Sequence, residues 1–471
     1  MLIDEGRIRE DDSVVFCFTR SEREVEIVEV FIKRGLRVKL ITMTEYDERF
    51  RDKVEVAFPS MRIENTLSEI ISRCGFKQVK ITESEKEVHL TKFYNGMRER
   101  PFKGERRIII PSPRVESFDQ KPEMNIEAVT KATLKEIQDK TNRYILINFP
   151  NVDVVGHCGR DDASILAIES VDNHLGMVVE KAKRRGMVVI VTADHGSVEY
   201  SKDLHHTTNP VPFIIISDSR LRLREGGELA DIAPTQLQIL GLEKPKEMSG
   251  RSLFEGSSIQ GDRILTVILD GWGIREETED NLIARANTPV MDFLKKNYSY
   301  TTLKASGEVV GLLPERPGNS EAGHLTIGTG RRVLSLDLRI KQAIEEGRFW
   351  KNRALLSAIE NVKKKNSSLH ILGMISDESS HGTIEHITAL LKLAKRENVK
   401  RVYIHGVLDR PGRIPAIDLI KDVEAKISEI GKGEFGLATL MGRDIALDRS
   451  KRYERVEMAY NALVFNRVYL S

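Results

Sequence analysis

The stretch MVVIVTADH, residues 187–195, is an apolar run that ends in an aspartate and a histidine. A short β-branched run of this kind predicts a buried strand. Two further apolar runs, at 144–149 and 264–269, are also followed by carboxylates or imidazoles. Charged groups at the ends of buried strands are costly unless a partner compensates them, so the pattern predicts a pair of divalent metal ions. The residues placed to bind them are Asp153, His157, Asp194, His195, His206 and Asp270.

Short β-branched runs alternate with charged stretches of helical period along the chain. We expect strands at 14–18, 37–42, 144–149, 188–193, 211–216, 264–269, 369–374 and 401–405. We expect helices at 22–34, 65–74, 126–140, 163–185 and 384–396. This alternation favours an α/β fold with mostly parallel sheets flanked by helices. In such sheets ligands bind beyond the carboxyl ends of the strands, where the aspartates fall.

Composition excludes several classes of protein. The chain has 471 residues, which favours more than one domain, and 73 Lys and Arg balance 71 Asp and Glu. This balance gives no support for a nucleic-acid partner or a membrane-surface role. The cysteines, at 17, 74 and 158, are odd in number and predict reduced thiols in a cytoplasmic protein. We expect no signal peptide, and no apolar run approaches the ~20 residues needed to span a bilayer.

Each metal-site motif has an ordinary explanation when taken alone. Asp-Val-Val-Gly-His is more often loop sequence, Asp-Gly-Trp-Gly can form a turn, and Asp-His can cap a helix beside a core histidine. Their occurrence together favours a functional site. The stretch GNSEAGH, residues 318–324, adds a candidate nucleophile, because the small residues around Ser320 let its hydroxyl reach a ligand.

At this point the sequence resembles the cofactor-independent phosphoglycerate mutases of the alkaline-phosphatase superfamily. The matching stretches are IIPSPR at 109–114, NFPNVDVVGH at 148–157, TADHG at 192–196, HTTNPVPF at 206–213, ILDGWG at 268–273 and GNSEAGH at 318–324. The resemblance implies an alkaline-phosphatase-like metal domain and a smaller α/β transferase domain. It also implies an isomerase of glycolysis that interconverts 3-phosphoglycerate and 2-phosphoglycerate through a phosphoserine.

The order of these motifs is circularly permuted relative to the family. The family begins with the Asp-Gly-Trp-Gly strand and its serine, and it ends with the Asp-His and His-Thr-Thr-Asn-Pro stretches. Here the ending comes first, and the Gly- and Ser-rich stretch at 249–261 resembles the joint between the old ends. We therefore expect a continuous metal domain at 59–334 and a transferase domain built from 1–58 and 335–471. Two chain crossings between the domains leave hinge closure possible.

The family pattern assigns the metal ligands and the nucleophile. It places one ion on Asp153, His157 and His206, and a second on Asp194, His195, Asp270 and the oxygen of Ser320. A metal-bound hydroxyl loses its proton more readily, and two ions about 4 Å apart can hold a transferring phosphoryl group. Mixed imidazole and carboxylate ligands suit several divalent metals. The resemblance points to manganese, with zinc, cobalt or magnesium as alternatives.

Arginines suit a small phosphorylated acid, because guanidinium binds phosphate and carboxylate through two parallel hydrogen bonds. The resemblance gives a substrate-binding set of Arg20, Arg23, Lys86, His381, Arg443 and Arg449. It implies no macromolecular partner and a monomer. The ordinary alternative for each arginine is a solvated surface side chain.

One loop departs from the family pattern. The family has Leu-Asp-Gly-Arg-Asp-Thr-Pro-Pro, whereas this chain has LDRPGRIP at 408–415. By position, Arg410 and Arg413 are the candidates for the family arginine, and Asp409 and Asp444 are candidate substitutes for its acid/base aspartate. Two alternatives therefore stay open. One is a metal-dependent phosphatase or phosphomutase acting on another small phosphorylated metabolite, and the other is a non-catalytic binding protein.

Overall fold

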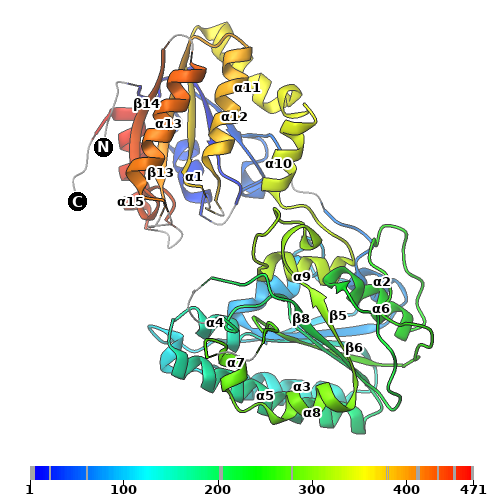
Figure 1. Cartoon of the computed structure of the whole chain (residues 1–471). Coiled ribbons are helices and arrows are strands. Elements are labelled where there is room, and N and C mark those ends of the chain that lie inside the picture. The colour runs from blue at the N-terminus through cyan, green and yellow to red at the C-terminus, as the bar shows by residue number, and fades with distance from the viewer. Residues whose placement is uncertain are drawn as a thin grey trace. The chain divides into compact units, whose positions relative to one another are not determined.

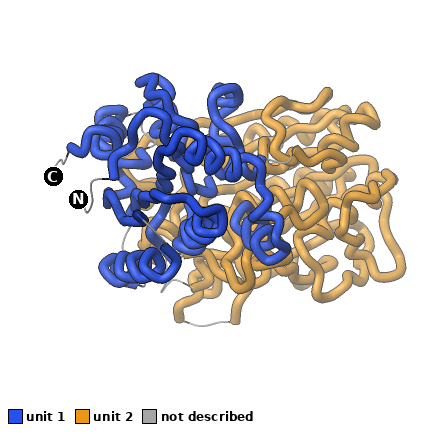
Figure 2. Tube along the Cα trace, turned by 90° about the horizontal axis from the view of Figure 1, so that it is seen from above, with its two compact units in different colours: residues 1–60, 336–471 blue, residues 61–335 orange. Residues whose placement is uncertain are grey.

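The computed structural model describes residues 6–20, 23–59, 62–200, 205–276, 279–377, 379, 381–409, 414–431, 434–448 and 452–467. The chain forms two compact units (Figure 2). Unit 1 comprises Met1–Ser60 and Leu336–Ser471, and unit 2 comprises Met61–Ser335. Unit 1 is thus built from both ends of the chain, whereas unit 2 is one continuous segment.

Unit 2 is built on an eight-stranded sheet in the order β5-β4-β6-β10-β7-β8-β11-β9. Its strands are β4 (Lys77–Glu83), β5 (Glu105–Ile110), β6 (Asn142–Phe149), β7 (Val188–Thr192), β8 (Val211–Ile216), β9 (Gly227–Glu228), β10 (Ile264–Leu269) and β11 (Ser299–Lys304). The five strands from β5 to β7 are parallel, and β8 pairs antiparallel with both β7 and β11. The central strands are buried along their whole length, which explains their continuous apolar sequences.

Two groups of helices cover this sheet. They are α2 (Leu67–Arg73), α3 (Ile126–Gln138), α4 (Asn151–Gly156), α5 (Asp161–Arg184), α6 (Ile232–Ile239), α7 (Leu282–Arg285), α8 (Pro289–Asn297) and α9 (Ser320–Thr329). Helices α3, α5 and α8 lie on one face, and α2, α6 and α9 lie on the other (Figure 1). The π-helical turn η3 (His89–Phe93) packs against α9.

Unit 1 has a six-stranded, fully parallel sheet in the order β14-β13-β12-β1-β2-β3. Its strands are β1 (Ser13–Cys17), β2 (Lys39–Thr42), β3 (Glu55–Val56), β12 (Leu369–Ile375), β13 (Arg401–Leu408) and β14 (Glu434–Gly442). Its helices are α1 (Val25–Arg34), α10 (Leu336–Glu345), α11 (Arg353–Lys365), α12 (Ile384–Arg396), α13 (Ala416–Ile430), α14 (Arg443–Ala446) and α15 (Tyr453–Phe465). The pairing of β1 with β12 joins the two ends of the sequence in one sheet.

The prediction of an α/β fold with mostly parallel sheets flanked by helices is confirmed. All eight expected strands are present, with ends that shift by a few residues. The expected linker at 249–261 is only partly exposed. Leu253 is fully buried, and Gly250 packs so closely on the Ala230 carbonyl that a side chain would clash. The longest exposed stretch runs from Glu255 to Ser258, and all of 249–261 belongs to unit 2.

Among the described residues, no helix combines the length and the apolar composition that crossing a bilayer requires.

Candidate metal centre

Three neighbouring parallel strands bring the candidate ligands to one edge of the unit 2 sheet. Strand β10 lies between β6 and β7, and Leu269 is in register with Phe149. Asp270 directly follows β10, Asp194 follows β7, and Asp153 lies in α4 after β6. The Asp153 amide donates to the Asp270 carbonyl at 3.1 Å, which fixes these two loops together. The carboxyl ends of parallel strands therefore gather the carboxylates, as expected for this kind of sheet.

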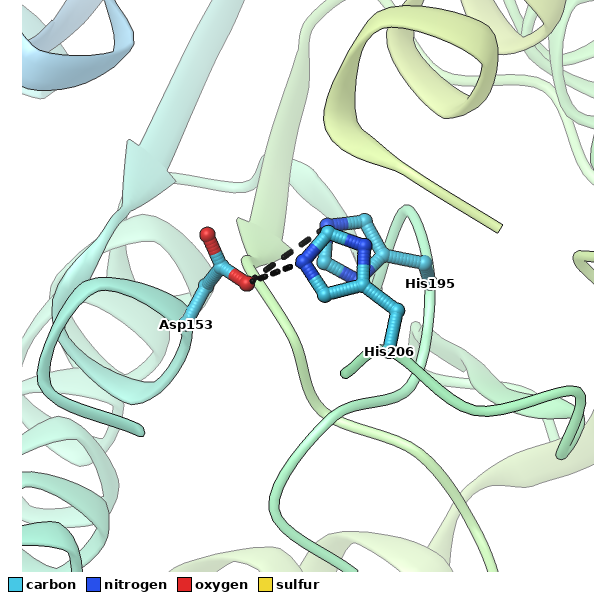
Figure 3. Close-up of side chains that lie close together, drawn as sticks. All are labelled: Asp153, His195 and His206. Atoms are coloured by element: carbon cyan, nitrogen blue, oxygen red, sulfur yellow. Dashed lines mark ion pairs between the residues drawn. The ribbon is translucent and has the colours of Figure 1, made fainter. Parts of the chain in front are cut away.

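The first potential metal group consists of Asp153, His195 and His206 (Figure 3). Asp153 Oδ1 lies 3.0 Å from His206 Nε2 and 3.8 Å from His195 Nε2. The two imidazole rings stack, with centroids 4.0 Å apart. His157 lies at the margin of this group, because its Nε2 is 3.0 Å from His206 Nε2 and 3.4 Å from Asp153 Oδ1.

The second potential metal group consists of Asp194, His195 and Asp270, all fully buried. His195 Nε2 lies 3.5 Å from both Asp194 Oδ2 and Asp270 Oδ1. His195 is thus the residue common to both groups. The structure brings together the six carboxylates and imidazoles named from the sequence.

Ser320, the predicted nucleophile, is the first residue of α9. The Asn319 side chain caps this helix by accepting from the Ala322 amide at 2.9 Å. Ser320 Oγ lies 3.0 Å from His195 Nε2 and 3.3 Å from Asp270 Oδ1. The hydroxyl therefore touches the second group at the positive end of a helix, where an oxyanion is favoured.

Lys86 places a buried ammonium among these acidic groups. Its Nζ lies 2.6 Å from Asp153 Oδ2, 2.7 Å from Asp270 Oδ1 and 2.6 Å from Ser320 Oγ. Burial would lower the pKa of Lys86, but Asp153, Asp270 and Asp194 raise it above its usual range. The ammonium therefore stays charged and compensates part of the carboxylate charge. It also contacts the serine oxygen to which a phosphoryl group would attach.

The pKa values of the neighbouring carboxylates and of His195 are shifted by the same close packing of charged groups. Burial would raise the pKa of Asp153 and of Asp270, but Lys86 and the neighbouring histidines hold both well below the usual range. Burial would lower the pKa of His195, but Asp194, Asp270 and Asp153 raise it to about 9. A cation that binds the His195 imidazole must therefore displace a proton.

The residues fit divalent metal ions. Asp153 Oδ1 and Asp194 Oδ2 are buried and accept no hydrogen bond of good geometry from the described residues. Ligand atoms around one tetrahedral ion lie about 3.3 Å apart. Asp153 lies 3.0 Å from His206 and 3.4 Å from His157, and His195 lies 3.5 Å from both Asp194 and Asp270, which are near this value. Mixed imidazole and carboxylate ligands suit zinc, manganese, iron or cobalt. Buried, unsatisfied carboxylate oxygens of this kind call for a cation.

Three buried polar residues around the site were not singled out by sequence reasoning. Glu199 accepts from the Ser197 amide at 2.8 Å and from the Thr207 hydroxyl, which ties the segment after His195 to the segment after His206. Asn148 and His324 contact the carboxylates of the second group. All three lie within or beside the matching motifs, but their residue types are common in loops and helices. Their roles depend on contacts between segments far apart in the sequence.

The described candidate substrate residues of unit 1 follow the carboxyl ends of three strands of its parallel sheet. Arg20 and Arg23 come after β1, His381 after β12, and Arg443 after β14. His381 is buried, and its Nδ1 lies 2.6 Å from Glu24 Oε1. Arg23 donates to the Leu447 carbonyl at 3.4 Å, and Arg443 pairs with Asp409 at 2.5 Å. Arg410, Arg413 and Arg449 lie outside the described residues.

Two family descriptions match different parts of the chain. The description "Metalloenzyme superfamily" matches residues 35–244, and "BPG-independent PGAM N-terminus" matches residues 340–469. The chain is also similar to curated proteins named 2,3-bisphosphoglycerate-independent phosphoglycerate mutase. It is 42% identical to the protein of Clostridium botulinum strain Langeland over 266 residues, which are 53% of this chain and 52% of the relative.

Another curated relative has a similar identity and coverage. The identity is 39% over 262 residues with the protein numbered 2 from Methanosarcina barkeri, covering 52% of this chain and 50% of the relative. The chain therefore spans about half the length of the curated relatives it matches. A solved phosphoglycerate mutase of Leishmania mexicana at low cobalt concentration is 28% identical, with a TM-score of 0.43. That comparison covers 48% of this chain and 45% of the other.

Proposed function

We propose that this protein is a phosphoglycerate mutase that interconverts 3-phosphoglycerate and 2-phosphoglycerate through a phosphoserine at Ser320. The observation that carries the proposal is the position of the Ser320 hydroxyl, 3.0 Å from His195 and 2.6 Å from Lys86, at two groups of potential metal ligands. The named relatives support the choice of substrate. Mutases of this kind act in glycolysis and gluconeogenesis.

We assign one divalent ion to Asp153, His157 and His206, and the second to Asp194, His195, Asp270 and Ser320. Two divalent ions, manganese in our proposal, would lower the pKa of the Ser320 hydroxyl and neutralise the phosphoryl oxygens. His195 is near both groups, but its Nε2 lies close to Asp194, Asp270 and Ser320, so we place it on the second ion. Lys86 would stabilise the negative charge of the phosphoserine.

The proposed reaction consists of two phosphoryl transfers. In the first, Ser320 Oγ forms a bond to phosphorus, the bond between phosphorus and the C3 oxygen of glycerate breaks, and that oxygen takes a proton. Glycerate then reorients. In the second, the C2 hydroxyl gives up its proton and bonds to phosphorus, and the bond from phosphorus to Ser320 Oγ breaks. Asp409 and Asp444 are our candidates for the carboxylate that exchanges the protons.

We propose that the arginines and the histidine of unit 1 bind the glycerate part of the substrate. Arg20, Arg23, His381 and Arg443 follow neighbouring strand ends, which is the usual ligand-binding edge of a parallel sheet. Arg410, Arg413 and Arg449 complete this proposed set. In this assignment unit 2 is the phosphatase-like metal domain and unit 1 is the transferase domain.

We also propose that the chain is a circular permutation of the family order. The description that names an N-terminus matches residues 340–469 of this chain, after the metalloenzyme match at 35–244, which supports the proposal. The joint would lie near 249–261. We further propose a cytoplasmic location, which the three free cysteines support. We also propose that the protein is a monomer.

The proposal is tested by supplying manganese-loaded protein with 3-phosphoglycerate and following 2-phosphoglycerate and free phosphate together. We expect 2-phosphoglycerate to form with little release of phosphate, because the phosphoserine returns its phosphate to glycerate. Release of phosphate without 2-phosphoglycerate would instead identify a phosphatase of the same superfamily. Ser320→Ala should abolish either reaction, whereas turnover by Ser320→Ala would disprove the nucleophile. Ser306→Ala, at a half-buried serine of unit 2 whose hydroxyl donates to the Thr208 carbonyl, is the matched control.

A further inference from the structure

Two fully buried polar residues, Asn148 and His324, contact the carboxylates of the second metal group. Asn148 lies in β6, in register with Ile268 of β10, and its Nδ2 donates to Asp270 Oδ2 at 2.8 Å. The same nitrogen lies 3.0 Å from His324 Nε2. His324 lies in α9, one turn after Ser320. Asn148 thus joins a strand end and a helix at the site.

The partners determine the orientation of both side chains. The Asp270 carboxylate can only accept, so the Asn148 amide must direct its NH₂ group toward Asp270. The second hydrogen of this NH₂ group points to His324, so Nε2 of the ring accepts and the ring proton lies on Nδ1. His324 Nδ1 is 2.9 Å from the Ser320 carbonyl and 3.2 Å from Asp194 Oδ2. One N–H of Asn148 therefore points at Asp270, and the N–H of His324 points at the Ser320 carbonyl.

The arrangement leaves the inward-facing oxygens of both carboxylates for a cation. Asp270 Oδ1 lies 3.3 Å from Ser320 Oγ, while its Oδ2 is held by Asn148. Asp194 Oδ1 accepts from the His195 amide at 3.1 Å, while its Oδ2 lies 3.5 Å from His195 Nε2. Gly323 lets α9 approach closely, since a side chain there would come within 2.5 Å of the Asp194 carbonyl. Asp270 Oδ2 is therefore held by Asn148, which lies outside the ligand set, and Asp194 Oδ1 is held by the amides of His195 and Gly271.

We infer that Asn148 and His324 are positioning residues that orient Asp270 and Ser320 for the ion of the second group. Groups that hydrogen-bond metal ligands fix their orientation, and their loss commonly costs about 10–100-fold in metal affinity. The inference rests on the proposed metal centre but not on the identity of the substrate. The inference predicts an effect on the second ion and not on the first, because Asp153 and His206 belong to the first group.

The test measures metal binding directly on the full chain. Calorimetric titration with Mn²⁺ should show two binding steps in the wild-type chain. We expect Asn148→Ala and His324→Leu to weaken one step by about 10–100-fold and to leave the other within about twofold. With Co²⁺ as the probe, the visible absorption of one site should change in both variants. His324→Asn, whose amide can replace the Nδ1 donor, should recover part of the affinity lost in His324→Leu.

Thr329→Ala is the matched control, because Thr329 is fully buried in the same helix but donates to the Leu325 carbonyl. It should leave both binding steps unchanged. Equal affinities in the wild type, Asn148→Ala and His324→Leu would overturn the inference, as would equal weakening of both steps. If His324→Leu does not fold, the same titration is used to compare the metal affinities of Asn148→Ala and Thr329→Ala, and that comparison tests the inference. Failure to form 2-phosphoglycerate would refute the proposed reaction and leave this result unaffected.

Discussion

At the scale of single residues, Lys86 is the cation that compensates Asp153 and Asp270. Its ammonium contacts both carboxylates, and all three side chains are buried. Removing one partner of a buried ion pair commonly destabilises a protein by about 3–5 kcal/mol. We therefore expect Lys86→Met to lower the thermal stability of the protein strongly in the presence of a chelator.

Divalent metal should reverse most of this loss, since the ions supply the positive charge that the variant lacks. Thermal unfolding with chelator and with saturating Mn²⁺ checks the prediction. Lys92→Met, at a more exposed lysine of the same segment, is the control and should change little under either condition. Equal destabilisation of Lys86→Met with and without metal would show that Lys86 does not share the role of the ions.

The sequence identified those site residues that directly follow a predicted strand. Asp194 and Asp270 follow apolar runs directly, so their place at the sheet edge follows from the strand prediction alone. Asn148 could not be identified in this way, because it lies within a buried strand and its partners Asp270 and His324 are distant in the sequence. The position of Lys86 among the carboxylates could not be predicted from sequence spacing either. Only the family resemblance indicated it.

At the scale of elements, helix α9 carries the nucleophile and packs closely on the end of β7. Gly323 lies one turn into this helix, and a Cβ atom there would come 2.5 Å from the Asp194 carbonyl and 2.8 Å from Asp194 Cβ. Gly323→Ala must therefore push α9 away from Asp194 and displace Ser320. We expect a loss of activity of at least about tenfold, since small displacements of positioned groups are costly.

Kinetic measurement of Gly323→Ala checks this prediction, with circular dichroism to show that the chain is folded. The control is Gly226→Ala, at a glycine with open space around its Cβ position but with a φ of 64°. That variant should lose some stability through backbone strain and keep its turnover. Full activity of Gly323→Ala would contradict the close packing of α9.

The sheet of unit 1 contains a buried chain of hydrogen bonds that responds to pH. His370 Nε2 contacts Asp12 at 3.1 Å, its Nδ1 lies 2.9 Å from His405 Nε2, and His405 Nδ1 lies 2.9 Å from the Thr439 hydroxyl. Burial lowers the pKa of His370 and, with His370 beside it, holds the pKa of His405 well below the usual range. Both rings are therefore neutral in the folded protein.

The unfolded histidines titrate near 6.5, above their folded values, so the unfolded chain takes up more protons at acidic pH. Stability is thus full above about pH 6.5 and falls as the pH drops, by up to about 1.4 kcal/mol per pH unit for each histidine. Denaturant unfolding between pH 7.5 and 5 measures this slope. His405→Gln should reduce the slope. An unchanged slope would show that His405 does not contribute to the pH dependence.

Strands with continuous apolar sequences could be predicted from the sequence, whereas β4 and β14 could not. Strands such as β7 and β10 are buried on both faces and have continuous apolar sequences. Strand β4 was missed because it contains Gln78 and Lys80, which are buried through contacts with distant partners. Lys80 Nζ donates to Asn95 Oδ1 at 2.5 Å, which a local sequence pattern cannot reveal. Strand β14 was also missed, because its ends are exposed and its short apolar stretch is interrupted by Gly436 and Thr439.

At the scale of the whole molecule, the proposed permutation makes a structural prediction. The Ile8 amide donates to the Leu463 carbonyl at 2.9 Å, so segments near both ends of the sequence lie side by side in unit 1. A rearranged chain that joins these ends through a short linker and opens within 255–260 should keep the same contacts. We expect a melting temperature within a few degrees of the parent and retained mutase activity.

The matched control opens the chain within β10, for example after Thr266, where the backbone is fully buried between β6 and β7. That chain should fail to fold, because it breaks the central strand. Circular dichroism, thermal unfolding and the mutase assay compare the three chains. Failure of the chain opened at 255–260 would mean that the sequence order itself is needed for folding.

The pairing of β1 with β12 has a consequence for biosynthesis. Strand β1 leaves the ribosome early, but its partner β12 is made only after all of unit 2 has been translated. During this interval the segment containing β1 and β2 has no completed sheet to join, and its apolar edge can pair with other nascent chains. Unit 2 has no such delay, because it is continuous. Chaperones that bind extended apolar segments should therefore associate with the first sixty residues until the C-terminal half has been synthesised.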